Sequence, residues 1–323
     1  KRNSVSKSDI LVMPKVHPLY VAALKATHTV HEYKPEDAAG LAAIAPRITG
    51  LAAGGESIVP GALIAQLPQL KVLSVFGVGY DGIDVQAAIS RKVPVTHTPD
   101  VLTDDVADLA IGLTLSVARN IPQADQYVRT GQWPSGPMRL GRKVSGARMG
   151  IVGLGRIGSA IARRAQAFGM SVAYTTRTER PDSGFAYYPS AAALAANVDF
   201  LVVITPGGQG TKHLINADVL KALGKHGYLI NVARGSVVDE AALVQALTDG
   251  TIAGAGLDVF ADEPNVPQAL LNMPHVVLTP HMASATHQTR QAMADLAFAN
   301  MQAGLAGTPL LTPVPECRAQ MGL

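Results

Sequence analysis

The stretch GIVGLGRIG, Gly150–Gly158, decides the fold expected for this chain. It begins inside the short apolar run Arg148–Val152, which predicts a fully buried parallel strand. After the glycines, Ser159–Phe168 continues with apolar residues at helical spacing. The glycines therefore stand between a strand and a helix, which is the context that the dinucleotide-binding fingerprint requires.

Each glycine of this loop has a physical task in such a fingerprint. Gly153 allows a tight turn, Gly155 lets the backbone approach a pyrophosphate, and Gly158 lets the helix lie close to the strand. The phosphates then meet free N–H groups at a helix N-terminus. The alternative is a glycine-rich turn without a ligand. The residues assigned to cofactor binding here are Gly153, Leu154, Gly155, Arg156, Ile157 and Gly158.

The end of the next expected strand indicates which dinucleotide binds. An NAD-binding domain carries an acidic residue there for the ribose hydroxyls. Here the strand Ser171–Thr175 is followed by Thr176, Arg177 and Thr178. An arginine and two hydroxyls suit a ribose phosphate, so these three residues predict NADP, with NAD as the weaker alternative. A solvated, charged surface loop would carry similar residues.

Short apolar runs alternate with helical segments along the whole chain, which predicts an α/β protein with parallel sheets and helices on both faces. The early strands expected are Asp9–Met13, Arg47–Ala52, Lys71–Phe76 and Val93–His97. The later ones are Met149–Val152, Ser171–Thr175, Asp199–Ile204, Tyr228–Val232, Gly254–Val259 and His275–Thr279.

A length of 323 residues indicates two domains. Because the fingerprint strand begins near residue 148, the cofactor domain is expected as an insertion, giving two Rossmann-like domains. Residues 100–287 form the expected dinucleotide-binding domain, and residues 1–99 with 288–323 the substrate-binding, catalytic domain. The long amphipathic helices Thr103–Arg119 and Thr286–Gln302 are expected near the two crossings.

Composition excludes several other classes of protein. The chain is 48% hydrophobic and 16% charged, as expected for a globular protein with a large core. Its single cysteine, Cys317, indicates a reducing compartment such as the cytoplasm. No apolar run approaches the roughly 20 residues of a membrane span. The net charge of +3 comes from scattered basic residues, so neither nucleic acid nor a membrane is an expected partner, and no metal site is assigned.

Three residues of the last third supply acid–base and anion-binding chemistry: Arg234 in NVARGSVVDE, Glu263 in GLDVFADEP and His281 in LTPHMASAT. An arginine can hold a carboxylate with two parallel charge-assisted bonds. A histidine can give a proton to a ketone oxygen, and a carboxylate can keep that histidine charged and oriented. Together they fit the reduction of a 2-oxo acid. Taken singly, each has a plainer interpretation: a structural ion pair, a loop charge or an exposed histidine.

The strings VLTDDVADLAIGLTLSVAR, GIVGLGRIG, LINVARGSVVDE, GAGLDVFADEP and LTPHMASAT together resemble the D-isomer-specific 2-hydroxyacid dehydrogenases. Within that family the chain looks most like the glyoxylate/hydroxypyruvate reductase and hydroxyphenylpyruvate reductase branch. The resemblance implies a homodimer and a nicotinamide cofactor. It also implies that Arg234 binds the substrate carboxylate, that His281 is the acid–base, and that Glu263 is its partner.

The same resemblance implies roles for other residues. Val78 and Gly79 would bind the substrate carboxylate through their backbone N–H groups. Asp258 would meet the nicotinamide amide, and Trp133 matches a position that reaches the partner subunit's active site. Further cofactor contacts fall on Val106, Thr211, Ala233 and His281, and His281 also contacts the substrate.

The function expected is NADPH-dependent reduction of glyoxylate to glycolate and of hydroxypyruvate to D-glycerate, with His281 as proton donor. One alternative is a bulkier 2-oxo acid, such as 2-ketogluconate or hydroxyphenylpyruvate. Formate oxidation is disfavoured because formate enzymes pair the histidine with glutamine where this chain has Glu263. A corepressor-like, nucleotide-sensing binding protein is the alternative from another class.

Overall fold

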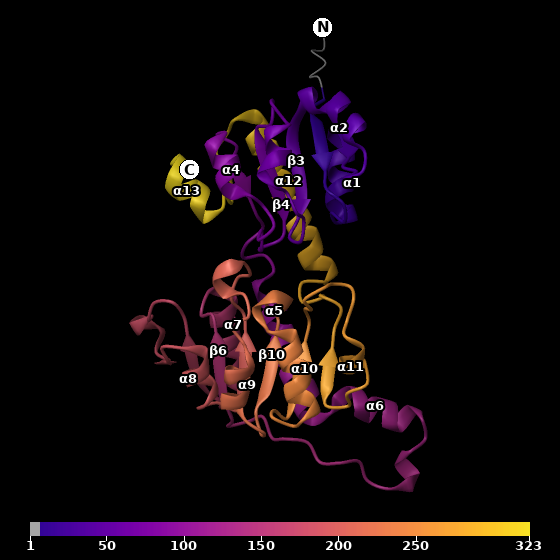
Figure 1. Cartoon of the computed structure of the whole chain (residues 1–323), viewed down its shortest axis with the longest axis vertical. Helices are drawn as coiled ribbons and strands as arrows, with labels where there is room; N and C mark the ends of the chain where they lie inside the picture. Colours follow the sequence, from indigo (N-terminus) through magenta and orange to yellow (C-terminus); the bar gives the residue numbers. More distant parts are fainter. Residues whose placement is uncertain (1–6) are drawn as a thin grey trace. The chain divides into compact units, whose positions relative to one another are not determined.

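The computed structural model describes residues 7–323; residues 1–6, which the first expected domain includes, lie outside the described residues. The chain forms two compact units. Unit 1 runs as far as Leu102 and resumes at Ala285–Leu323, and unit 2 is Thr103–Ser284. Unit 2 is thus inserted into unit 1 (Figure 1). Each unit is a parallel sheet with helices, which confirms the predicted α/β class.

Unit 1 contains a five-stranded sheet with the order β2-β1-β3-β4-β5, in which all neighbours are parallel. The order of the strands reverses between β1 and β3, as it does in doubly wound sheets. The strands are β1 (Asp9–Val12), β2 (Thr29–Glu32), β3 (Ile48–Gly54), β4 (Val72–Phe76) and β5 (Val95–Thr96). The helices are α1 (Pro18–Thr27), α2 (Ala38–Ile44), α3 (Gly61–Ala65), α4 (Val85–Ser90), α12 (His287–Ala306) and α13 (Pro315–Met321), with the 3₁₀ turn η1 (Ala45–Arg47).

Unit 2 contains a seven-stranded parallel sheet with the order β12-β11-β10-β9-β6-β7-β8. Its strands are β6 (Arg148–Val152), β7 (Ser171–Thr175), β8 (Ala186–Tyr187), β9 (Phe200–Val203), β10 (Tyr228–Asn231), β11 (Gly254–Leu257) and β12 (Val276–Leu278). The order reverses between β6 and β9, and ligands of doubly wound sheets bind at such a switch point. The fingerprint glycines follow β6 directly, so they lie at this point.

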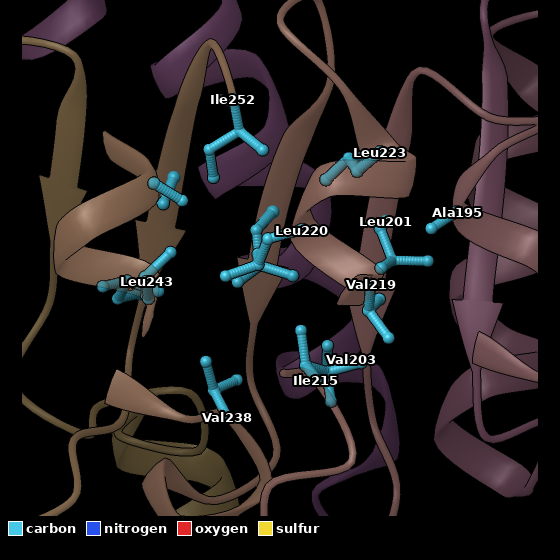
Figure 2. Packing of buried hydrophobic residues seen from close by; sticks show 14 of the residues in the cluster. Ala195, Leu201, Val203, Ile215, Val219, Leu220, Leu223, Val238, Leu243 and Ile252 are labelled. Atoms are coloured by element: carbon cyan, nitrogen blue, oxygen red, sulfur yellow. The ribbon is translucent and has the colours of Figure 1, made fainter. Parts of the chain in front are cut away.

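The helices of unit 2 are α5 (Thr103–Arg119), α6 (Ile121–Arg129), α7 (Arg156–Ala167), α8 (Ala191–Ala195), α9 (Ala217–Leu223), α10 (Glu240–Thr248) and α11 (Gln268–Leu271). Short 3₁₀ turns are η2 (Trp133–Ser135), η3 (Pro181–Ser183), η4 (Gln209–Thr211) and η5 (Gly235–Val237). One large buried cluster packs α8, α9 and α10 against the sheet, with Leu201, Leu220 and Leu243 among its members (Figure 2). Burial of each such leucine stabilises the fold by about 1.5–3 kcal/mol.

Helix α5 begins and ends at the predicted residues and packs against α7. Asp104 and Asp108 in its N-terminal half both bind Arg164 of α7, at 3.0 and 2.6 Å. These contacts lie across the C-terminal half of the helix that follows the fingerprint. They therefore join α5 to α7 by ion pairs at the surface.

The structure also contains two strands that the sequence did not predict, β2 and β8. Both are edge strands, and neither contains a buried residue. An edge strand with one solvated face needs no run of apolar residues, so the signal used for the other strands was missing.

Helix α6 lies at the surface of unit 2. It has no buried residue, although its apolar residues lie along one face. Figure 1 shows α6 and the segment after it extending away from the sheet of unit 2. Exposed apolar side chains of this segment are Ile121, Val128, Trp133 and Leu140. Within residues 7–323, no helix is both long and apolar enough for a membrane crossing.

Candidate active site

The turn after β6 has the geometry of a phosphate-binding loop. Gly153 has φ +106°, and a Cβ there would lie 2.6 Å from the carbonyl oxygen of Ile204. A Cβ on Gly158 would overlap the carbonyl oxygen of Gly153. Both positions therefore require glycine, as the fingerprint interpretation expected, because the helix and the strand approach each other here.

The N-terminus of α7 is open. Gly155 is the N-cap residue, and no side chain caps the helix. Nothing lies within 4 Å of the position that a Cβ on Gly155 would take. Leu154 is buried, Ile157 is half-buried and Arg156 is exposed. The first N–H groups of the helix therefore face space that a phosphate could enter.

The end of β7 presents the residues expected to distinguish NADP from NAD. The hydroxyl of Thr176 donates to the carbonyl of Thr178 at 2.6 Å, which closes a tight turn. Arg177, between them, is exposed, and so is Thr178. Tyr187 of β8 donates its hydroxyl to the carbonyl of Thr176 at 3.4 Å. A side chain of the neighbouring strand β8 thus binds the backbone of this turn, and Arg177 is exposed to solvent.

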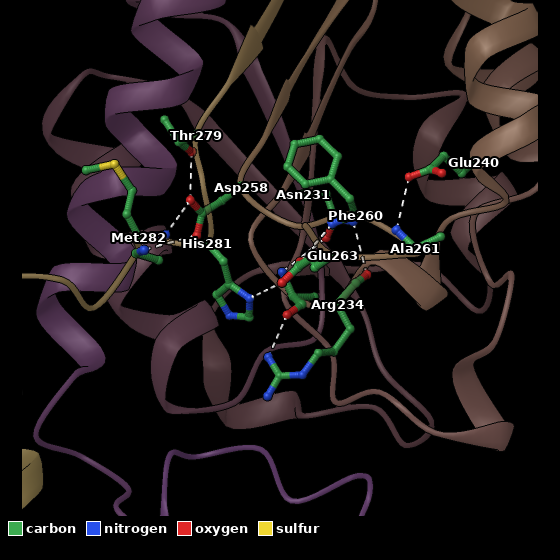
Figure 3. A network of polar contacts seen from close by, with 12 residues as sticks. Asn231, Arg234, Glu240, Asp258, Phe260, Ala261, Glu263, Thr279, His281 and Met282 are labelled. Atoms are coloured by element: carbon green, nitrogen blue, oxygen red, sulfur yellow. Dashed lines mark hydrogen bonds and ion pairs between the residues drawn. The ribbon is translucent and has the colours of Figure 1, made fainter. Parts of the chain in front are cut away.

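His281 and Glu263 form a direct pair. Nδ1 of His281 lies 2.7 Å from Oε2 of Glu263, and the two side chains are 31% and 20% exposed (Figure 3). The other carboxylate oxygen accepts the N–H of Phe260 at 2.9 Å. Because the carboxylate occupies Nδ1, the imidazole is oriented with Nε2 directed away from Glu263.

Arg234 follows β10 in an extended conformation and is half-buried. One of its terminal nitrogens donates to the carbonyl of Ala233 at 2.8 Å. The next residue, Gly235, touches the loop that carries Glu263, since a Cβ on it would overlap the backbone of Phe260 and Ala261. The absence of a side chain at Gly235 therefore lets the Arg234 turn approach the Glu263 loop.

Asp258 is fully buried just after β11. Its carboxylate accepts bonds from the hydroxyl of Thr279 and from the N–H groups of Met282 and Ala283, at 2.7, 2.8 and 3.0 Å. Burial raises the pKa of this carboxyl above its usual range, and the three bonds act in the opposite direction. The side chain of Asp258 thus contacts the residues on either side of His281. Its expected contact with a nicotinamide amide stays a prediction.

The remaining predicted residues lie in separate places. Val106 and Ala233 are buried in unit 2, whereas Thr211 is half-buried and donates its hydroxyl to the carbonyl of Pro206 at 2.7 Å. Val78 and Gly79 belong to unit 1, just after β4. The carbonyl of Val78 binds Nδ1 of His97 at 2.9 Å, which holds this turn.

Sequence reasoning missed Asn231, Gly235 and Thr279, all of which shape the site. Asn231 is 1% exposed and holds the backbone around Arg234. A polar residue at the end of the otherwise apolar strand YLIN was the available signal for Asn231. The sequence carries no comparable signal for Gly235 or Thr279. Gly235 approaches the backbone of a loop that is distant in sequence, and Thr279 binds the side chain of Asp258.

Comparison with known proteins finds one family and several relatives that are similar to this chain. The model of the D-isomer specific 2-hydroxyacid dehydrogenase NAD binding domain matches residues 111–283, more than half of the chain. The chain is 46% identical to a 2-ketogluconate reductase of Gluconobacter oxydans (strain 621H), covering 96% of this chain and 99% of the relative. It is 52% identical to a hydroxyphenylpyruvate reductase of Plectranthus scutellarioides, over 78% of this chain and 80% of that one.

A crystal structure is similarly close to the whole chain. It is that of an NADPH-dependent glyoxylate/hydroxypyruvate reductase of Sinorhizobium meliloti in complex with NADP and malonate. The TM-score is 0.91 at 50% sequence identity, covering 96% of this chain and 98% of that one. The protein therefore belongs to the D-isomer specific 2-hydroxyacid dehydrogenases, which confirms the resemblance noted in the sequence.

The contact at Gly235 yields a test of the site. In Gly235→Ala, the new methyl group would overlap the Phe260–Ala261 backbone, so the Arg234 turn and the Glu263 loop must separate. We expect a loss of about 1–3 kcal/mol in the free energy of unfolding, together with a fall in turnover. Urea denaturation and steady-state kinetics measure the two effects.

Gly112→Ala is the matched control, because nothing lies within 4 Å of its Cβ position and it stands inside α5. That variant should keep activity and gain up to about 1 kcal/mol of stability, since alanine favours a helix more than glycine does. Equal behaviour of the two variants would contradict the close approach at Gly235.

Proposed function

We propose that this protein is an NADPH-dependent reductase of small 2-oxo acids, with glyoxylate and hydroxypyruvate as first candidates. The observation that carries the proposal is the pairing of His281 with Glu263 at 2.7 Å, together with the close approach of the Glu263 loop to the Arg234 turn at Gly235. Membership of the 2-hydroxyacid dehydrogenase family defines the reaction type. The names of the relatives support this range of substrates.

Arg234 is assigned to substrate binding in this proposal. Its guanidinium is planar and permanently charged, and its donors match the two oxygens of a carboxylate. The remaining donors can polarise the ketone oxygen of the same molecule. The N–H groups of Val78 and Gly79 in unit 1 are assigned to the carboxylate as well.

His281 is assigned as the proton donor. Glu263 holds Nδ1, so Nε2 is the atom that would give its proton to the ketone oxygen during reduction. The negative charge of Glu263 stabilises the protonated imidazole before transfer. Because the Phe260 N–H fixes the other carboxylate oxygen, the imidazole is already oriented before a substrate arrives.

The residues of unit 2 fit a dinucleotide. The open N-terminus of α7 suits the pyrophosphate, and the exposed Arg177 with Thr176 and Thr178 suits a ribose phosphate. When bound, the nicotinamide supplies the hydride. The Sinorhizobium meliloti structure, in complex with NADP, supports this choice of cofactor. Val106, Thr211, Ala233 and Asp258 keep their proposed places around the cofactor.

A homodimer is part of the proposal, and its support is the segment from α6 to Leu140. The side chains of Ile121, Val128 and Trp133 are 48%, 54% and 66% exposed, and that of Leu140 is 96% exposed. Apolar residues gathered on one extended segment indicate a surface that another chain covers. The cytoplasmic location expected from the single cysteine stays a prediction.

Two relatives favour a second candidate within the same chemistry, a bulkier 2-oxo acid. They are the 2-ketogluconate reductase and the hydroxyphenylpyruvate reductase. NADPH oxidation with glyoxylate, hydroxypyruvate, 2-ketogluconate and hydroxyphenylpyruvate separates the candidates by kcat/KM. Absence of turnover with every acid would overturn the proposal and favour a corepressor-like binding protein.

Arg234→Lys and Arg234→Ala test the carboxylate assignment. The lysine keeps the charge but loses the fork, and the alanine loses both. We expect kcat/KM to fall about 100-fold or more in the alanine variant, with the lysine variant between it and wild type. Arg163→Lys, at an exposed position on α7, is the control and should behave as wild type. Wild-type efficiency in a folded Arg234→Ala protein would remove the assignment.

Glu263→Gln tests the pair with His281. The neutral amide no longer favours the charged imidazole, so His281 loses its proton at lower pH. The pH at which reduction becomes half-maximal on the alkaline side should therefore move down. A pH–rate profile of kcat/KM measures this shift. An unchanged profile would show that Glu263 does not act on the proton donor.

Arg177→Ala tests the cofactor preference. A charge-assisted contact with the ribose phosphate is worth about 1.5–3 kcal/mol, or about 10- to 150-fold in the ratio of kcat/KM for NADPH over NADH. The variant should lose that preference, and Thr176→Asp should turn it toward NADH by repelling the phosphate. Arg180→Ala removes another exposed charge of the same loop and should leave the ratio nearly unchanged. If Arg177→Ala and Arg180→Ala lower this ratio equally, the preference reflects the overall charge of the loop, and Arg177 does not bind the ribose phosphate.

A further inference from the structure

Two buried polar side chains stand at the ends of neighbouring strands in unit 2. Asn231 is the last residue of β10 and is 1% exposed, and Asp258 follows β11 and is fully buried. A buried amide or carboxylate is costly unless its hydrogen bonds are made. Both side chains make theirs with the loops that carry the proposed site residues (Figure 3).

Asn231 fixes the turn at Arg234 from two sides. Its side-chain oxygen accepts the N–H of Ala233 at 3.0 Å, and its side-chain nitrogen donates to the carbonyl of Arg234 at 3.1 Å. One amide group therefore binds the backbone before and after the Cα of Arg234. Its contact is with the main chain, so the guanidinium stays available for its own partners.

Asp258 fixes the turn at His281 with four bonds. Three reach its carboxylate, from the Thr279 hydroxyl and from the N–H groups of Met282 and Ala283. The fourth runs from the N–H of His281 to the main-chain carbonyl of Asp258, at 2.8 Å. His281 itself has φ +49°, in the left-handed region that few non-glycine residues adopt. Such a conformation persists only where the surrounding bonds hold it.

The two holding residues are themselves joined. The N–H of Asp258 donates to the carbonyl of Asn231 at 3.0 Å, directly after the parallel ladder of β10 and β11 ends. A displacement of either residue therefore changes the position of the other. The backbone connection runs from the Arg234 turn through Asn231 and Asp258 to the His281 turn.

We propose that Asn231 and Asp258 are positioning residues, and that Asp258 acts on the reaction through His281 while Asn231 acts through Arg234. This inference rests on the proposed function of those two residues. The carboxylate is suited to its place because three donors converge on it, and only an acceptor without hydrogens of its own can satisfy all three. An asparagine there would direct its NH₂ group at one of the donors.

A double-mutant cycle between Asp258 and His281 tests the first half. Asp258→Asn alone should lower kcat by about 10- to 100-fold, because a small misplacement of the proton donor has a large effect on turnover. In a His281→Ala background the same change should alter the residual kcat by less than about 2-fold. If Asp258→Asn lowers kcat by the same factor with and without His281, the two residues act independently and Asp258 is not a positioning residue for His281.

Two milder variants, Thr279→Val and Thr279→Ser, test the same role of Asp258. They apply if Asp258→Asn does not fold, or if the residual activity of the His281→Ala protein is too low to measure. Valine removes the bond to Asp258, and serine keeps it. We expect kcat to fall about 2- to 10-fold in Thr279→Val and to recover in Thr279→Ser. The Kd for NADPH should stay unchanged in both. Equal kcat in valine and serine variants would contradict the proposal.

Asp249→Asn is the matched control for loss of a carboxylate. Asp249 accepts the N–H and the hydroxyl of Thr251, at 2.9 and 2.6 Å, in the turn that ends α10. It should lower the free energy of unfolding without a change in kcat. If it lowers kcat as much as Asp258→Asn does, the effect reflects general stability and the proposal is wrong.

A second cycle pairs Asn231→Asp with Arg234→Lys. Aspartate keeps the acceptor for Ala233 but sets an oxygen against the Arg234 carbonyl, so Asn231→Asp should raise KM for the 2-oxo acid. In the Arg234→Lys background the rise should shrink to less than about 2-fold. Asn216→Ala, which removes the amide that caps α9, is the control and should leave KM unchanged. If Arg234→Lys and His281→Ala both retain wild-type kinetics, the proposed function is wrong. If these variants do lose activity but the effects of the paired substitutions simply multiply, the proposed function stands and only the positioning roles of Asn231 and Asp258 are wrong.

Discussion

The parallel register of β10, β11 and β12 is the constraint on which the site of unit 2 depends. All neighbouring strands of this sheet run in the same direction, so their carboxyl ends share one edge. Arg234, Glu263 and His281 come from the three segments that leave this edge, although 46 residues lie between the first and the last in sequence. A loop that follows a buried parallel strand starts from a fixed backbone, which makes it a stable base for a reactive side chain.

The site is held mainly by bonds to backbone atoms. Glu263 is anchored by an N–H of Phe260, and His281 by Asp258 through main-chain and carboxylate oxygens. Such bonds remove conformational freedom from the backbone of the loops that carry the reactive side chains. The buried carboxylate of Asp258 is tolerated because three donors meet it, in agreement with the general rule that buried charges need partners.

Much of this could be predicted from the sequence, because local patterns report local structure. The strand–glycine–helix pattern at Gly150–Gly158 predicted the switch-point loop, and the apolar stripe and first-turn acids of Thr103–Arg119 predicted α5. Strands β2 and β8 were missed because edge strands need no apolar run. Asn231 and Thr279 were missed as parts of the site because their partners, a backbone turn and a buried carboxylate, become neighbours only in the folded sheet.

The left-handed backbone of His281 limits which residues evolution or design could place there. Among residues with a side chain, asparagine, aspartate and histidine adopt this conformation most readily, and β-branched or bulky residues adopt it with strain. Of these three, histidine alone changes charge near neutral pH without a large perturbation. A designer who wished to replace the imidazole with a tyrosine acid would place a bulky residue in a strained conformation in the turn between β12 and α12. The backbone itself therefore restricts the choice of acid–base group.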